Sequence, residues 1–282
     1  MTLTALVLMV ASAFAHAGWN YLAKRVRGAS AFLWVTTAVA VVLYAPLTAA
    51  VLILGRPRLG PPAFGFMAGS AALHLTYFGL LFRGYAVGDL SLVYPLARAT
   101  GPLLAALGGV LLLAERPSPT AVAGILLIAG GGLVAGSERR PGSLPAVAYA
   151  VLTGVLIAVY TVWDKQAVSG LRVPPLVYMW AIEAGLLLLL SPWILRRRSE
   201  VLETWRMHRR EAVAVGILTP LAYVLVLTAL SIAPVYLVAG RELGPLIGTI
   251  MGIRLLGEEG ARRRLPAAAA MVVGIGLLAV GR

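Results

Sequence analysis

The sequence predicts an all-α integral membrane protein with ten transmembrane helices, arranged as two inverted repeats of five. Three observations lead to this prediction. Hydrophobic residues make up 60% of the 282 and charged residues only 12%, about half the charged share of an ordinary soluble domain. The apolar residues fall into runs of about 17 to 25, the length that crosses a hydrocarbon core about 30 Å thick. Finally, two segments in opposite halves of the chain share one pattern of charged and turn residues.

The apolar runs predict ten membrane spans, separated by short stretches rich in Gly, Pro and basic residues. The spans cover 2–23, 30–54, 62–84, 91–113, 118–136, 145–164, 174–195, 211–231, 234–256 and 265–281. The first span resembles a secretory signal peptide, because Ala13-Phe14-Ala15 is similar to a cleavage site. However, no Lys or Arg precedes it and its apolar run continues to Trp19, so we expect a retained helix.

An internal repeat divides the chain into a first half, 1–137, and a second half, 144–282. A shift of 143 residues places 98–115 on 241–258, and eight of these eighteen positions are identical. The matched positions include Arg98 with Arg241, Gly101-Pro102 with Gly244-Pro245, Gly109 with Gly252, and Glu115 with Glu258. Because each half holds five spans, an odd number, the second half enters the membrane upside down relative to the first. Inverted repeats of this kind place a transported solute between the halves, near mid-membrane.

These features resemble those of the drug/metabolite transporter superfamily, EamA-like branch. The resemblance rests on five-plus-five spans, on "HAGWN" at positions 16–20 followed by Lys24, and on "LLLAER" and "LLGEE" at the ends of the fourth and ninth spans. It covers the whole chain and implies a ten-helix secondary transporter in the plasma (inner) membrane, crossing it many times. Members carry amino acids, sugars, nucleotide sugars, cations and drugs, so the resemblance leaves the substrate open.

Two arginines at matched positions are the first candidates for substrate binding. Arg98 lies about 10 Å into its span, counting about seven residues at 1.5 Å each, and Arg241 lies equally deep in a span that enters from the opposite face. Pro102 and Pro245 follow four residues later and cannot donate to the arginine carbonyls, so we expect a helix kink beside each arginine. A guanidinium is suited to a carboxylate or a phosphate, and the resemblance implies the same role for basic residues on these two helices.

Charged side chains inside the bilayer are costly, so each is a functional candidate. Glu183, near the middle of the seventh span, could couple transport to protons, receive an ammonium group, or pair with a buried arginine. Arg98 and Arg241 could instead reach lipid headgroups, or pair with Glu242 and Glu183 in a purely structural role. The full set of candidates for coupling or ion pairing is Glu183, Glu242, Lys24, Asp164 and Lys165.

Polar and aromatic side chains mark the other candidates for substrate binding. His16 and Asn20 recur at a spacing of four with Lys24, which places them on one face of the first helix. Such a face must turn toward protein or a water-filled cavity, not toward lipid. The remaining candidates are Trp19, His74, Tyr77, Tyr160 and Tyr223. For Trp19 the alternative is a place in the aromatic belt at the membrane interface.

Several classes of function are disfavoured. The chain has no Cys and only three His, and it contains no Gly-rich phosphate loop and no metal-spaced ligand set, so we expect neither an enzyme, nor a cofactor, nor a metal site. Its net charge is +13 with a pI near 10.9. The basic residues lie mostly in short loops between apolar runs, where membrane orientation and contacts with anionic lipids explain them better than nucleic acid does.

We therefore expect a secondary transporter that exports a small anionic or zwitterionic organic metabolite, with lipids as neighbours, protons as the coupling ion, and a monomeric or homodimeric state. One alternative is a multidrug or cationic-metabolite exporter that uses Glu183 and aromatic residues. Another is a non-transporting scaffold or receptor. Fourteen Lys and Arg in the loops of one side, against six on the other, predict that both chain ends lie outside the cell. Many ten-helix relatives have both ends in the cytoplasm, and here we follow the count.

Overall fold

The computed structural model describes residues 3–23, 26, 29–88, 90–136, 144–242 and 261–281. Within these ranges every regular element is a helix, which confirms the predicted all-α class. The α-helices are α1 (Leu3–Ala23), α2 (Ala29–Gly55), α3 (Pro61–Val87), α4 (Leu90–Leu113), α5 (Pro119–Gly136), α6 (Leu144–Lys165), α7 (Pro175–Ile194), α8 (Arg198–Ile232) and α10 (Ala261–Val280). A π-helical turn, η1 (Gln166–Gly170), follows α6. Two 3-10 segments, η2 (Leu195–Arg197) and η3 (Val235–Glu242), precede and follow α8.

The helices are apolar over lengths that suit a bilayer. Six helical stretches in the described ranges are long and apolar enough to cross a membrane, and one of them, Pro175–Ile232, contains both α7 and α8. Two further apolar helices are shorter, Pro119–Val134 and Ala269–Val280.

Two elements differ from the predicted spans. α8 begins at Arg198 instead of position 211, because a basic helical segment joins the apolar one across a kink at His208, where the backbone is not helical (φ −130°, ψ 26°). The predicted ninth span begins as the 3-10 segment η3, and its remaining residues, Pro245 included, lie outside the described ranges. α4 remains helical on both sides of Pro102, so the proline predicted to kink α4 does not interrupt it.

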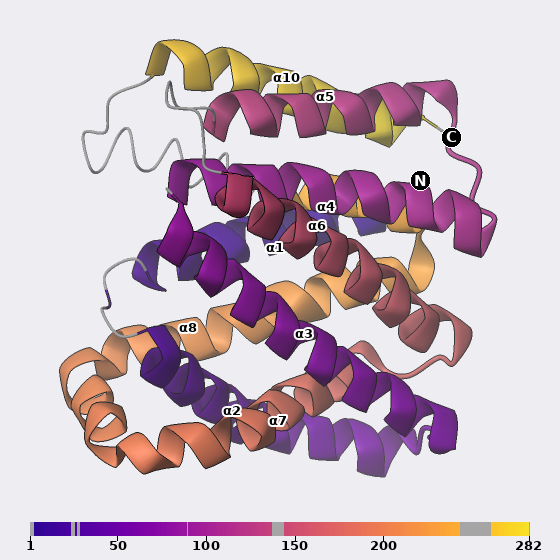
Figure 1. The fold of residues 1–282 in the computed structure, drawn as a ribbon. Helices are drawn as coiled ribbons and strands as arrows, with labels where there is room; N and C mark the ends of the chain where they lie inside the picture. The colour runs from indigo at the N-terminus through magenta and orange to yellow at the C-terminus, as the bar shows by residue number, and fades with distance from the viewer. Residues whose placement is uncertain are drawn as a thin grey trace.

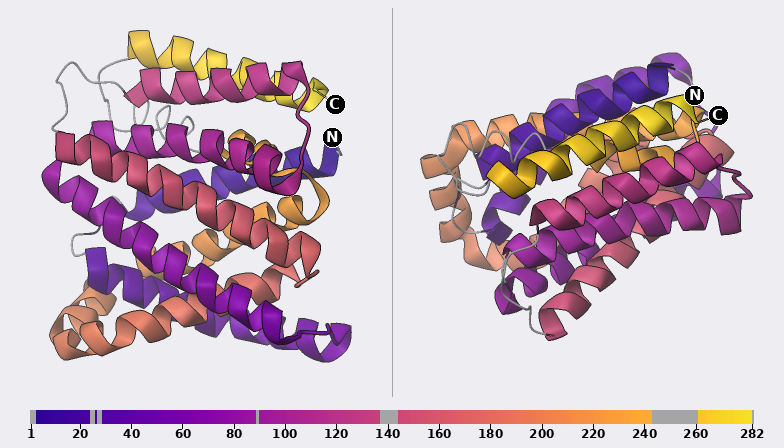
Figure 2. Two further views of the ribbon diagram at one scale, coloured as in Figure 1. Left: turned by 45° about the vertical axis from the view of Figure 1, so that its right-hand side comes forward. Right: turned by 90° about the horizontal axis from the view of Figure 1, so that it is seen from above.

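The helices pack as a bundle in which segments distant in sequence lie side by side. α5 and α10 form one edge, and α2 and α7 lie at the opposite edge (Figures 1 and 2). Between these edges α1 packs on α8, α3 on α6, and α4 on α6 and η3. The start of α1 and the end of α10 lie at the same end of the bundle (Figure 2).

Glycines allow the closest of these contacts. A Cβ added at Gly124 of α5 would lie 2.5 Å from the carbonyl oxygen of Gly274 in α10, and one added at Gly274 would lie 2.7 Å from that of Gly124. The two backbones therefore meet directly, as small residues permit at helix interfaces in lipid.

This contact gives a stability prediction. Gly124→Ala should destabilise the protein by about 1–3 kcal/mol, because the new methyl group meets backbone that must move. Gly130→Ala on the same helix is the matched control, since no atom lies within 4 Å of its added Cβ. It should be neutral or slightly stabilising, because Ala favours helix over Gly. Thermal unfolding in detergent measures both, and equal melting temperatures for the two variants would contradict the packing.

Candidate functional site

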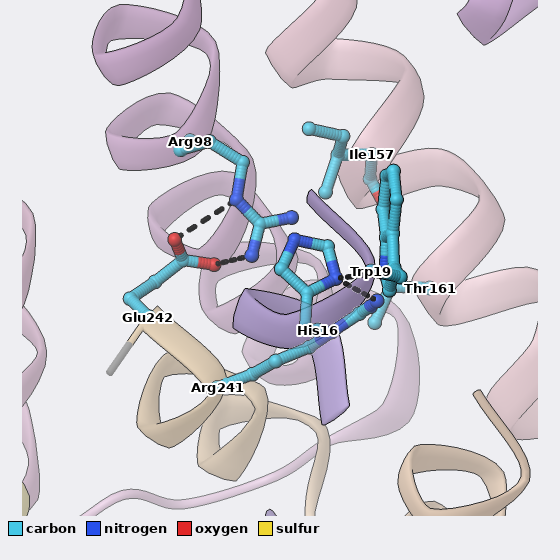
Figure 3. Close-up of polar contacts among 7 residues, drawn as sticks. All are labelled: His16, Trp19, Arg98, Ile157, Thr161, Arg241 and Glu242. Carbon is cyan, nitrogen blue, oxygen red and sulfur yellow. Dashed lines mark hydrogen bonds and ion pairs between the residues drawn. The ribbon is translucent and has the colours of Figure 1, made fainter. Parts of the chain in front are cut away.

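A buried ion pair joins α4 to η3. Arg98 Nε donates to Glu242 Oε2 at 3.0 Å, and a terminal nitrogen of the same guanidinium lies 2.7 Å from Oε1 (Figure 3). The two residues are 6% and 5% exposed. A carboxylate bound in this two-pronged way satisfies the planar guanidinium fork well. Glu242 follows Arg241 directly, so the second matched arginine lies beside the pair.

The second arginine of the repeat has a different environment. Arg241 donates from Nη2 to Nδ1 of His16 at 3.3 Å, and its guanidinium carbon lies 5.8 Å from the centre of the Tyr223 ring. Within the described ranges no carboxylate lies at ion-pair distance from Arg241, and its buried Nε has no hydrogen-bond partner. In this part of the chain, Arg98 is therefore neutralised by an acid and Arg241 is not.

His16 of α1 accepts the hydrogen bond from Arg241 with the lone pair of Nδ1. His16 Nδ1 also accepts a hydrogen bond from the Trp19 indole at 3.2 Å, with the two rings edge to face at 5.0 Å (Figure 3). Both donors bring a proton, so we assign an unprotonated Nδ1 and a neutral imidazole. His16 therefore supports a cationic group without adding a charge of its own.

An aromatic cluster from three helices adjoins the arginines. The rings of His74 (α3) and Tyr160 (α6) lie 4.3 Å apart at 30°, and the Tyr223 ring (α8) meets His74 edge-on at 5.3 Å. Tyr77, one turn after His74, meets Tyr160 at 5.8 Å. The cluster therefore extends from His74 and Tyr77 of α3 to Tyr223, the residue over whose ring Arg241 lies.

A fully buried carboxylate contacts Tyr223, one of the residues of this cluster. Asp164 of α6 is 0% exposed, and its Oδ1 accepts the Tyr178 hydroxyl at 2.7 Å. Its Oδ2 accepts the Tyr223 hydroxyl, and Ser70 of α3 also hydrogen bonds to this carboxylate. Three neutral hydroxyl groups thus surround the charge, as burial of a carboxylate requires.

Lys165, a further charged candidate, and Glu115, a matched residue of the repeat, make contacts with helix ends. Lys165, next to Asp164, extends to the end of α8 and donates to the carbonyls of Leu230 at 2.7 Å and Ala233 at 2.8 Å. Both are unpaired carbonyls of a helix terminus, where a cation is favourable. Glu115, at the end of α4, receives the backbone N–H of Val235 at 2.8 and 3.0 Å and so caps the start of η3.

Glu183 lies apart from the arginines. It hydrogen bonds with Thr37, which places it between α7 and α2, and its charge also acts on Tyr44 of α2. The alternative that Glu183 pairs with Arg98 or Arg241 does not occur in the described residues, because Arg98 is bound to Glu242 and Arg241 to His16.

The structure gathers most of the predicted site residues in one region, around Arg98, Arg241, His16, the aromatic cluster and Asp164. Lys24, Pro245 and the side chain of Asn20 lie outside the described residues. Sequence reasoning missed Ser70 and Tyr178, the other two donors to Asp164. Ser70 lies one helical turn before His74, and Tyr178 carries a hydroxyl group within an otherwise apolar helix. The positions of these polar side chains on α3 and α7 are the signal that could have identified them. No group of three or more His, Asp or Glu suited to a metal occurs among the described residues.

Comparisons with known proteins bear on the fold alone. No family model matches the sequence, and no curated protein does. A solved structure described as "Crystal structure of protein" is similar over 98% of this chain and 96% of that one, with a TM-score of 0.76 and 19% identity. This similarity extends over nearly the whole of both chains, so the helix arrangement occurs as a complete fold in a second protein.

The ion pair gives a prediction that separates buried from exposed charges. Glu242→Gln should destabilise the protein by about 3–5 kcal/mol, because the Arg98 charge then lies buried without a carboxylate. The control is Glu200→Gln, which breaks an exposed pair with Arg197 at 3.6 Å and should cost less than about 1 kcal/mol. Chemical unfolding in detergent compares the two. A small loss for Glu242→Gln would contradict the proposed burial of this pair.

Proposed function

We propose that the chain is a ten-helix integral membrane protein of the plasma membrane, and that it works as an EamA-like secondary transporter of the drug/metabolite transporter superfamily. Its substrate would be a small anionic or zwitterionic organic metabolite, moved in the export direction. The single observation that favours an anion is the guanidinium of Arg241, which has no carboxylate at ion-pair distance within the described residues. The apolar helices support membrane insertion by their length and composition.

The helix contacts support two related halves. When α1 to α5 are matched in order with α6, α7, α8, η3 and α10, contacts recur in corresponding pairs. The pairs are α1–α8 with α6–α3, α2–α8 with α7–α3, α4–α6 with η3–α1, and α4–α5 with η3–α10. The contacts α2–α7, α5–α10 and α4–η3 are their own counterparts. This symmetry fits inverted repeats over 1–137 and 144–282.

The position of the site supports alternating access. His16 and Arg98 belong to the first half, and Tyr223, Arg241 and Glu242 to the second. A solute bound at Arg241 would therefore contact both halves. Rocking one half against the other would then expose the solute first to one side and then to the other.

The charge balance at the site supports an anionic substrate. The Arg98–Glu242 pair has no net charge, and His16 is neutral, so the guanidinium of Arg241 is the remaining positive group. A carboxylate or phosphate would satisfy both this charge and the buried Nε. Among the alternatives, a cation site built from Glu183 and the aromatic cluster is disfavoured, because Glu183 lies at the α2–α7 contact.

Membrane topology gives the first test, which the lack of native Cys makes simple. In the ten-span arrangement the loops at Arg58 and Arg172 share one side, and Ser199 lies on the other. An impermeant maleimide applied to intact cells should label Arg58→Cys and Arg172→Cys but leave Ser199→Cys unlabelled, given the distribution of basic residues. Labelling only at Ser199→Cys would reverse the orientation, whereas labelling Arg58→Cys and Arg172→Cys from different sides would contradict the span count.

Ligand binding gives the second test. Benzenesulfonate is a suitable probe, because it is a small planar anion whose charge does not change over the pH range of a protein experiment. It should stabilise the purified protein against heat, as any ligand of the native state does. Arg241→Gln should remove this effect, while Arg58→Gln, in an exposed loop, should retain it. Equal stabilisation of the wild type and Arg241→Gln would refute the assigned site, and stabilisation by tetraethylammonium alone would favour the cation exporter.

A further inference from the structure

Besides the Arg98–Glu242 pair, the described part of the site contains two charged groups that contact one aromatic residue, Tyr223. The Tyr223 ring lies beneath the guanidinium of Arg241, and the Tyr223 hydroxyl donates to Asp164. Within the described residues Asp164 has no cation at ion-pair distance. Tyr223 therefore contacts both a guanidinium and a carboxylate, two opposite charges that sum to zero without forming an ion pair, in surroundings where charge is poorly screened.

An anion at Arg241 would upset this balance. Its negative charge would neutralise the guanidinium and leave the carboxylate of Asp164 as an uncompensated buried charge, which is costly in a membrane protein. Uptake of one proton by Asp164 restores neutrality. The chemistry is a simple protonation, in which a proton from the water on the open side adds to a carboxylate oxygen and no other bond changes. The Tyr223 hydroxyl, until then a donor to Oδ2, can turn and accept from the acid that is formed.

We propose that Asp164 is the proton-binding residue that couples anion transport at Arg241 to proton movement, one proton with each negative charge. This inference rests on the proposed function. With anion and proton both bound, the site would have no net charge. The protein could then change from one access state to the other without moving net charge across the membrane. Release of the anion on the far side would restore the Arg241–Asp164 balance and release the proton there.

The groups that interact with Asp164 lie on α3, α6, α7 and α8. They are Ser70 and His74 from α3, Tyr160 from its own helix, Tyr178 from α7 and Tyr223 from α8. The only ordinary acid or base among them, apart from Asp164, is His74, whose Nδ1 lies 2.9 Å from the Ser70 carbonyl. His16 adjoins Arg241 but uses its lone pair to hold that residue. Glu183, a carboxylate for which the sequence left proton coupling open, lies instead at the α2–α7 contact, where it hydrogen bonds with Thr37.

Linkage fixes the direction of the effect. If anion binding promotes protonation of Asp164, protonation strengthens anion binding by the same factor. Affinity for benzenesulfonate should therefore be high at pH values where Asp164 is protonated and fall as rising pH deprotonates it. The probe itself does not titrate, so any pH dependence comes from the protein.

Isothermal titration calorimetry of the full-length protein in detergent tests the proposal. Between low and high pH the wild-type dissociation constant should rise, within the range of about 5- to 150-fold typical of coupled sites. Measurements in two buffers of different ionisation enthalpy should give an uptake of about one proton per bound anion, as the charge balance requires. Asp164→Asn, which is always neutral, should bind with the tight low-pH affinity throughout and take up no proton.

Further variants keep the test decisive. Glu183→Gln should retain the wild-type pH dependence, and proton uptake should persist in His74→Gln. If Asp164→Asn does not fold, Tyr223→Phe serves instead. This variant retains the ring beneath Arg241 but removes the hydroxyl that contacts Asp164. The pH at which benzenesulfonate affinity falls should therefore shift. Anion binding that is independent of pH, or loss of proton uptake in Glu183→Gln or His74→Gln, would overturn the inference alone. A wild type that binds no benzenesulfonate at any pH would instead overturn the anion site itself.

Discussion

The mutual neutralisation of two buried charges, those of Arg98 and Glu242, is the constraint on which the rest of the site depends. The pair joins α4 in the first half of the chain to η3 in the second, and both partners are almost fully buried. Two charges can be buried at this depth only when each satisfies the other with good geometry. The pair lies directly beside Arg241, which contacts His16 and Tyr223.

The contrast between the two arginines gives the site its chemistry. Their equivalence in the repeat suggests that both arginines bind substrate. Arg98, however, forms an ion pair with Glu242, whereas Arg241 contacts the neutral side chains of His16 and Tyr223. Neutral partners position Arg241 without neutralising it, as the proposed binding of an anion requires. The same principle applies to Asp164, whose three donors are all hydroxyl groups.

Much of the helix arrangement could be predicted from the sequence, because apolar runs and turn residues mark the helices and their ends strongly. Most helix boundaries lie within a few residues of the predicted ones, but α8 begins thirteen residues before its predicted start, since its basic first part is helical without being apolar. The matched pattern singled out Arg98 and Arg241, but could not choose Glu242 over Glu183 as the partner. That choice depends on the rotation of α4 and α7 about their axes, which periodicity in a uniformly apolar helix does not record. For the same reason the sequence did not identify Ser70 and Tyr178 as hydrogen-bond donors to Asp164, because helix packing alone places them next to it.

The most direct test of this account removes the ion pair as a unit. Replacing both Arg98 and Glu242 with Met eliminates two opposite charges together and leaves apolar side chains of similar length, a change that buried pairs often tolerate. If Arg98 serves the structure and Arg241 serves the ligand, the double variant should fold and bind benzenesulfonate within a few-fold of the wild-type affinity. A folded double variant that binds no benzenesulfonate would contradict the account, because it would place Arg98 in contact with the anion.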